Sequence, residues 1–181
     1  MVWVVLIVLI ILIVLIVFGY NQLIKLRNMV KDQWSQIDVL LKRRCDLIPN
    51  LVETVKGYAK HEKDTLEAVI NARNKSVTAN SINDSTIANS ELTGALNKLF
   101  ALSEAYPDLK ANSNFIDLQK KLKETEDKIA YARQFYNDTV LKYNNKVEMI
   151  PTNIVALLFG FKKYDFFEIL DEERQVTKVK F

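Results

Sequence analysis

The segment VWVVLIVLIILIVLIVF, residues 2–18, decides the architecture of this chain because it contains no polar side chain apart from the Trp3 indole. As a helix its seventeen residues would span about 26 Å, at about 1.5 Å per residue. That length is close to the roughly 30 Å hydrocarbon core of a bilayer. Each Leu, Ile or Val contributes about −0.3 to −0.6 kcal/mol to insertion, so the run favours the membrane by several kcal/mol. The segment therefore predicts a transmembrane anchor over residues 1–19.

Three other interpretations of this run fit the residues less well. A cleaved signal peptide needs a basic region before the run and a small-residue cleavage site after it. Here only the α-amine of Met1 precedes the run, and Gly19-Tyr20-Asn21-Gln22 is not such a site. A lipoprotein needs a cysteine at the end of the run, but the single cysteine is Cys45. A buried core helix of this length would usually contain Ala, Ser or Gly, which residues 2–18 lack.

The charges that follow the run predict the orientation of the anchor. Lys25, Arg27 and Lys31 come just after it, against one acid, Asp32, and only the amino terminus is charged before it. Under the positive-inside rule this places the C-terminal domain in the cytoplasm and Met1 outside. A single cysteine agrees with a reducing compartment, since no disulfide can form within one chain.

Composition predicts an all-α domain after the anchor. About 160 residues are enough for one domain with its own core. The chain contains only 4 Gly and 3 Pro, and it is rich in residues that favour helices. Its net charge of +3 is too small for a nucleic-acid surface. We expect an elongated antiparallel helical bundle with long, coiled-coil-like helices.

The first predicted helix runs from Leu23 to about Lys75, where apolar residues recur at steps of three and four. Pro49 interrupts this pattern and leaves the carbonyl of Cys45 without its usual donor. The helix is expected to kink or break there, or to restart with Pro49 in its first turn. Residues 76–90 are rich in Ser, Thr and Asn, which predicts a polar loop.

A second helix is predicted over about Glu91 to Ala105, ended by Tyr106-Pro107-Asp108. The third helix has the clearest pattern, an apolar row at seven-residue intervals typical of a coiled-coil seam. Either Asn112 or Ser113 would cap it, and Pro151 would end it. The members of the row are Phe115, Leu122, Ile129, Tyr136, Tyr143 and Ile150.

The short apolar run Ile154–Phe161 cannot span a bilayer. Two interpretations stay open: a cap packed on the end of the bundle, or a segment that enters the membrane interface. Residues 162–181 form a tail, expected to be loosely ordered beyond Tyr164. The predicted organisation is therefore an anchor (1–19), a bundle (20–161) and a tail (162–181).

Motifs between about Tyr20 and Phe167 resemble those of the LemA family. The resemblance does not extend to residues 76–90 or to the tail. The matching motifs are Tyr20-Asn21, Leu26-Arg27-Asn28, Trp34-Ser35-Gln36-Ile37-Asp38-Val39, Leu41-Lys42-Arg43-Arg44, Asp46-Leu47-Ile48-Pro49-Asn50-Leu51-Val52, Val55-Lys56-Gly57-Tyr58-Ala59, His61-Glu62, Ala72-Arg73, Glu104-Ala105-Tyr106-Pro107-Asp108-Leu109-Lys110-Ala111-Asn112, Asn114-Phe115, Thr125-Glu126, Ile129-Ala130, Ala132-Arg133 and Tyr136-Asn137.

The resemblance implies a bacterial single-span membrane protein with a cytosolic antiparallel helical bundle. It implies no enzymatic activity, since none is established for the family as a whole. Some relatives are linked to the building of intracellular membrane compartments, which suggests scaffolding by analogy.

The residues themselves predict no enzyme, metal site or cofactor. His61 is the one histidine, so neither an HExxH site nor a two-histidine site can form within one chain. Tyr58 stands where a Glu-x-x-His element would have its glutamate. Cys45 and His61 would lie roughly 24 Å apart along a continuous helix. The scattered glycines form no phosphate-binding loop.

Polar residues within the helices are the remaining candidates for a site. They are either ion pairs that fix the register of the helices or a polar site inside the bundle, and the Tyr106 turn is either a docking turn or a packed turn. The candidates are Arg44, Asp46, Asn50, Glu53, Tyr106, Asp108, Glu126, Arg133, Tyr136 and Asn137.

We therefore expect a membrane-anchored scaffold or adaptor that associates with itself, with the lipid bilayer and further proteins as partners. The alternative is a signalling module that senses a ligand within the bundle. An enzyme is a third, less favoured class.

Overall fold

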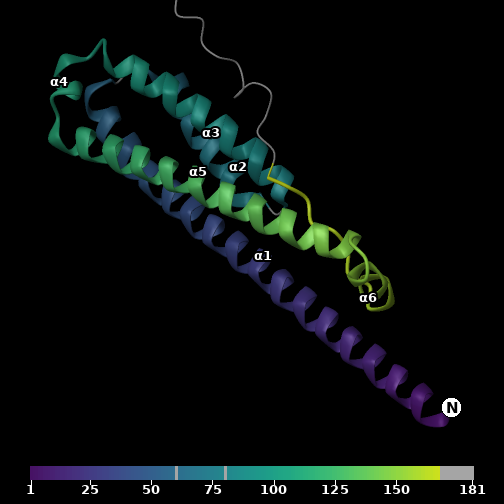
Figure 1. Ribbon diagram of the computed structural model, residues 1–181. Coiled ribbons are helices and arrows are strands. Elements are labelled where there is room, and N and C mark those ends of the chain that lie inside the picture. Colours follow the sequence, from purple (N-terminus) through teal and green to yellow (C-terminus); the bar gives the residue numbers. More distant parts are fainter. Residues whose placement is uncertain (60, 80, 168–181) are drawn as a thin grey trace, which may run out of the picture. The chain divides into compact units, whose positions relative to one another are not determined.

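The computed structural model describes residues 1–59, 61–79 and 81–167, and within them the chain forms helices and no strands (Figure 1). The predicted all-α fold is confirmed. Its coiled-coil geometry stays a prediction. The helices are α1 (Val2–Tyr58), α2 (Lys63–Thr78), α3 (Ile82–Ser103), α4 (Pro107–Lys110), α5 (Ser113–Glu148) and α6 (Thr152–Leu158).

Helix α1 continues through Pro49 and ends at Tyr58. A break or a restart at Pro49 is therefore wrong, and so is the expectation of one helix reaching Lys75, whereas a kink at Pro49 stays a prediction. The Cys45 carbonyl, which loses its backbone donor to Pro49, accepts a hydrogen bond from Nε of Arg73 at 3.2 Å. A side chain of α2 thus supplies the missing donor, which satisfies a buried carbonyl that would otherwise favour a break.

The polar loop predicted over residues 76–90 is also wrong, because α3 begins at Ile82. Ser81 caps this helix: its Oγ accepts a hydrogen bond from the backbone N–H of Asp84 at 3.0 Å. The Thr86 hydroxyl donates to the Ile82 carbonyl within the same helix. The Ser and Thr residues that favour a loop by composition serve here as a cap and as donors to helix carbonyls.

The chain divides into two compact units, and each is described by itself. The first unit comprises Met1–Gln36 and Ala132–Phe166, and the second comprises Ile37–Tyr131 and Phe167–Phe181. In the second unit, α2 and α3 lie side by side (Figure 1). Its apolar core draws on α1, α2, α3, α4 and α5. Among its buried members are Ile48, Leu51, Val55, Val69, Leu92, Leu96, Leu99, Leu109, Phe115 and Leu122.

The seven-residue row of α5 is buried at five of its six positions. Phe115, Leu122, Ile129, Tyr136 and Tyr143 expose between 0% and 4% of their surface. Ile150 is 81% exposed, so the prediction is wrong there, because α5 ends at Glu148. Asn112 is the residue that caps α5: its Oδ1 accepts a hydrogen bond from the Phe115 N–H at 3.0 Å.

In the first unit, the segment after α6 lies against α5. Tyr164 is bound to Asn144 by two hydrogen bonds, one through its N–H and one through its carbonyl. The Tyr143 hydroxyl donates to the Lys162 carbonyl at 3.0 Å. Most of the tail predicted to be loosely ordered, residues 168–181, lies outside the described residues.

Candidate functional site

The N-terminal part of α1 presents an uninterrupted apolar surface. Every side chain from Val2 to Phe18 is exposed, between 36% and 79%. Among the described helices, α1 is the one that is long and apolar enough to cross a membrane by length and composition. A contiguous apolar surface of this kind is rare on a protein that faces only water. The exposed row therefore indicates a membrane anchor.

The second unit contains a buried ionic cluster around Arg44. This side chain is almost fully buried, and its Nη1 lies 2.7 Å from Oε2 of Glu126. Nη1 also donates to Oδ1 of Asn89 at 2.5 Å, and Nη2 donates to Oγ1 of Thr93 at 2.9 Å. A buried guanidinium is tolerated when its charge and donors are matched in this way. The cluster joins α1, α3 and α5.

Arg44 stands in an otherwise apolar row of α1. Leu23, Val30, Ile37 and Leu51 are buried, and Arg44 occupies the position that continues their seven-residue spacing. A single polar residue in such a row favours the one register that satisfies it. The geometry thus supports the interpretation of Arg44 and Glu126 as an ion pair that fixes helix register.

A cavity of about 240 Å³ lies beside this cluster. Arg44 and Glu126 line it together with Leu96, Phe100 and Leu122. Its volume is below the roughly 300–1,000 Å³ of most ligand pockets. Arg44 and Glu126 already bind each other, so a ligand that used either of these charges would have to compete with the ion pair. Lys123 and Asp127 line the same cavity.

Three other predicted residues of α1 do not join the cluster. Asp46 is exposed and pairs with Lys42 at 3.1 Å. Glu53 is exposed and lies 3.6 Å from Lys56. Asn50 is exposed, and its carbonyl accepts a hydrogen bond from Thr54. Exposed pairs of this kind contribute little to stability.

Tyr106 belongs to a packed turn before α4. Its hydroxyl donates to Oε1 of Glu62 at 2.9 Å. This hydrogen bond to Glu62, with some burial, raises the pKa of Tyr106. Asp108 is exposed in the first turn of α4. The contact explains why a tyrosine stands in this turn, and it leaves Asp108 facing solvent.

The remaining predicted residues lie in the first unit, whereas the Arg44 cluster lies in the second. Tyr136 is fully buried, and its hydroxyl donates to the Asp165 carbonyl at 3.1 Å. Burial, followed by the nearby Tyr164 and Asp165, raises the pKa of Tyr136 to about 12. Arg133 and Asn137 are half-buried. The predicted polar residues of α5 therefore lie in different units, Glu126 in the second and the other three in the first.

Sequence reasoning missed Asn89 and Thr93 as members of the Arg44 cluster. Asn89 was assigned to the predicted loop, so its side chain was not considered as a core partner. Thr86, Asn89 and Thr93 follow one another at steps of three and four, which is the spacing of one helix face. That spacing, and the place of Arg44 in the apolar row of α1, could have pointed to the cluster.

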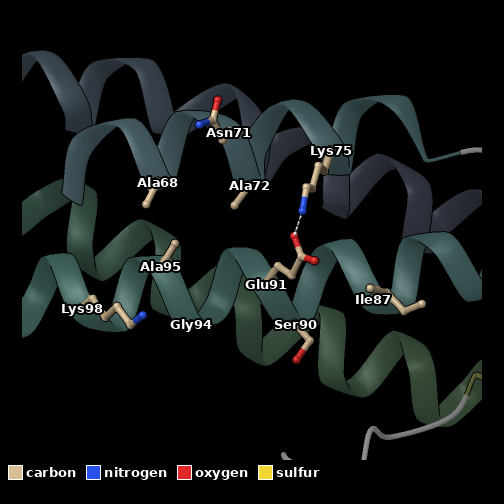
Figure 2. A pocket seen from close by; sticks show the side chains of 10 residues that line it. All are labelled: Ala68, Asn71, Ala72, Lys75, Ile87, Ser90, Glu91, Gly94, Ala95 and Lys98. Carbon is tan, nitrogen blue, oxygen red and sulfur yellow. Dashed lines mark hydrogen bonds and ion pairs between the residues drawn. The ribbon is translucent and has the colours of Figure 1, made fainter. Parts of the chain in front are cut away.

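A shallow groove of about 710 Å³ runs between α2 and α3 (Figure 2). Half of its lining residues are small, among them Ala68 and Ala72 on α2 and Gly94 and Ala95 on α3. An ion pair of 2.6 Å between Lys75 and Glu91 joins the two helices across it. Small side chains allow another helix to approach closely.

The groups that could perform covalent or metal chemistry are few. Within residues 1–59, 61–79 and 81–167, no group of three or more His, Cys, Asp and Glu side chains could hold a metal ion. Cys45 is buried, and this burial raises the pKa of its thiol. A protonated, buried thiol is a poor nucleophile.

Comparison with known proteins identifies relatives of this chain. Protein LemA of Metamycoplasma hominis is 27% identical over 158 residues, which cover 85% of this chain and 71% of that protein. Magnetosome proteins MamQ 1 and MamQ 2 of Paramagnetospirillum magneticum are each 24% identical over 175 residues, covering 82% of this chain. The chain spans 64% of the length of these magnetosome proteins. The model of the LemA family matches residues 33–181, and the chain therefore belongs to the LemA family.

Proposed function

We propose that this protein is a membrane-anchored helical scaffold or adaptor that associates with copies of itself and with other proteins. One observation carries the proposal: a single unbroken helix, α1, contains both the exposed apolar row of residues 2–18 and buried core residues such as Leu51 and Val55. A helix of this kind ties a folded domain directly to a bilayer. Similarity to proteins described as magnetosome proteins supports a role at a membrane.

The same proposal includes an orientation. Lys25, Arg27 and Lys31 follow the apolar row within about four turns. Positive residues close to a span favour the cytoplasmic side. The bundle therefore lies in the cytoplasm of a bacterial cell, with Met1 on the other side of the membrane.

The groove between α2 and α3 is the proposed surface for self-association. Its small residues leave room for a helix of a second copy, and exposed Ile87 stands at its wall. Positive Lys75 and Lys98 and negative Glu91 line the same groove. A symmetric dimer uses the same patch on both copies, so a patch that carries both signs of charge is compatible with one.

Filling the groove tests this proposal. Gly94→Leu places a large side chain in the groove, and a Cβ at Gly94 meets nothing within 4 Å. Gly57→Leu is the matched control, because its added Cβ also meets nothing within 4 Å and it lies outside the groove. The full chain in liposomes should give an amine-cross-linked dimer for the wild type and for Gly57→Leu, and little for Gly94→Leu. Equal dimer yields in all three, or none in the wild type, would contradict it.

Ligand sensing is the second candidate, and the cavity beside Arg44 is the place in the bundle where a small ligand would bind. A ligand bound only by the folded state at about 100 times its Kd raises stability by about 2.7 kcal/mol. Thermal unfolding of the full chain in mild detergent, against a panel of small metabolites, would reveal such a ligand. The shift should fall when Lys123→Ala alters the exposed rim of the cavity. Without a shift, the scaffold proposal stands alone.

A further inference from the structure

Helix α6 has two apolar faces with different surroundings. Val155 and Ala156 are buried, at 5% and 2% exposure. Ile154, Leu157 and Leu158 are exposed, at 57%, 85% and 67%. A short helix that only capped the unit would need one apolar face. The exposed face therefore needs a further explanation.

The position of α6 is fixed against the end of the apolar row of α1. A Cβ placed on Gly19 would lie 3.3 Å from Cγ2 of Val155 and 3.7 Å from Cγ2 of Thr152. Gly19 directly follows Phe18, the last residue of the row. The absence of a side chain at Gly19 thus lets α6 pack at the level where α1 leaves the hydrocarbon region.

Aromatic and cationic contacts hold the turn after α6 at the same level. The ring of Tyr20 lies 4.8 Å from that of Phe159 and 5.7 Å from that of Phe161, centre to centre. The guanidinium of Arg27 lies 5.3 Å from the centre of the Phe161 ring. Aromatic rings beside basic residues are typical of the boundary between hydrocarbon and headgroups.

The turn is also well defined. Gly160 has a φ of 69°, a conformation that residues with a Cβ adopt only at a cost. The N–H of Phe161 donates to the Ala156 carbonyl at 2.9 Å, and that of Gly160 to the Leu157 carbonyl at 3.4 Å. These two bonds form a Schellman motif, which ends the helix and satisfies its last carbonyls. The exposed residues are thus presented on a fixed surface.

We propose that the exposed face of α6 and Phe159 are inserted in the interface of the same membrane that α1 crosses. Lipid is the occupant that fits, because the buried face of α6 packs at Gly19, directly after the exposed apolar row of α1, and so places the exposed face of α6 close to the end of that row. Exposed Lys162 and Lys163 follow the turn and would meet anionic headgroups. The inference rests on the membrane anchor of the proposed function, but not on self-association.

This second insertion would restrict how α1 sits in the bilayer. A lone apolar helix is free to rotate about its axis and to tilt. With α6 inserted beside it, the face of α1 that carries Gly19 is held toward the interface. The protein would then be attached to the membrane at two adjacent places.

Spin labelling of the full chain in liposomes tests the insertion. In a Cys45→Ala background, one cysteine is introduced at Leu157, at Leu9 or at Ile116, and each is labelled with a nitroxide. Leu9 and Ile116 are matched controls, 51% and 50% exposed, for the lipid and for water. At Leu157 we expect an oxygen-to-nickel accessibility ratio several-fold above that at Ile116, and near that at Leu9.

Each other outcome has a distinct meaning. A ratio at Leu157 equal to that at Ile116 places the face in water and overturns the inference. Low accessibility to both reagents, with dipolar broadening, shows a second copy covering the face and also overturns it. If the accessibility ratio at Leu9 is that of a site in lipid in these cases, the proposed membrane anchor is still supported. If the ratio at Leu9 is that of a site in water, the membrane anchor of the proposed function is contradicted as well.

Discussion

Helix α1 contains two regions with the same backbone and opposite surroundings. Residues 2–18 are apolar on every side and exposed on every side. Between Leu23 and Val55, one face is buried and the opposite face carries charged residues such as Lys31 and Lys42. Helix formation therefore does not distinguish the two regions. The arrangement of apolar side chains around the helix does, because it matches one region to lipid and the other to a protein core.

The largest effect should come from placing charge in the first region. Arginine at the centre of a span costs about 2.5–3.5 kcal/mol, so Leu9→Arg with Leu12→Arg should cost about 5–7 kcal/mol and remove the protein from the membrane fraction. The control pair is Ile116→Arg with Leu141→Arg, at exposed apolar positions of α5. Alkaline extraction of membranes followed by immunoblotting measures both. If the Leu9/Leu12 variant stayed in the membrane fraction after alkaline extraction, residues 2–18 would not be what anchors the protein in the membrane.

The second-largest effect should come from placing charge in a buried row. Ile129 is 0% exposed in α5, so Ile129→Asp buries an unpaired carboxyl and should cost about 4 kcal/mol or more. Ala130→Asp, at the exposed neighbouring position, should change stability by less than about 0.5 kcal/mol. Urea unfolding followed by circular dichroism compares them. Two equally stable variants would mean that the row faces water.

A smaller effect separates buried from exposed ion pairs. Glu126→Gln leaves Arg44 with a neutral partner, and since Glu126 is partly exposed we expect a loss of about 1–2 kcal/mol. Asp46→Asn removes an exposed pair with Lys42 and should cost less than about 0.5 kcal/mol. The denaturant midpoints of the two variants, each compared with the wild type, measure the two losses of stability. The register interpretation is wrong if Glu126→Gln is as stable as Asp46→Asn.

The last effect is confined to alkaline pH. The folded state raises the pKa of Tyr136 to about 12, above the value near 10 of a free tyrosine. Its contribution to stability is therefore complete below pH 10 and is lost as pH rises toward 12. Tyr136→Phe should be less stable at neutral pH, because the bond to Asp165 is lost, and should lose less stability between pH 10 and 12. Parallel slopes for the two proteins would contradict this.

The parts of the fold that follow from periodicity could be predicted from the sequence. The apolar row of α5 and the exposed row of residues 2–18 are both patterns along one helix, and local spacing specifies them. The helical state of residues 82–90 could not be predicted from their polar composition. It depends on a cap at Ser81 and on partners of Asn89 in another helix, and composition contains no information about either.

The candidate site shows the same limit. Arg44 and Glu126 were both among the predicted residues, but their pairing joins α1 to α5 across 82 positions of sequence, and local spacing does not predict it. Pro49 shows the reverse case: its local effect was expected, but a bond from Arg73 to the freed carbonyl lets the helix continue. Contacts between distant helices decided both outcomes.

Sided labelling tests most directly whether residues 2–18 span the membrane with the bundle in the cytoplasm. In a Cys45→Ala background, single cysteines are placed at Val2 and at exposed Asn83, and intact cells are treated with a membrane-impermeant maleimide. We predict labelling of Val2→Cys in intact cells, and of Asn83→Cys only after lysis. Labelling of Asn83→Cys in intact cells, or of neither position before lysis and both after it, would contradict this account.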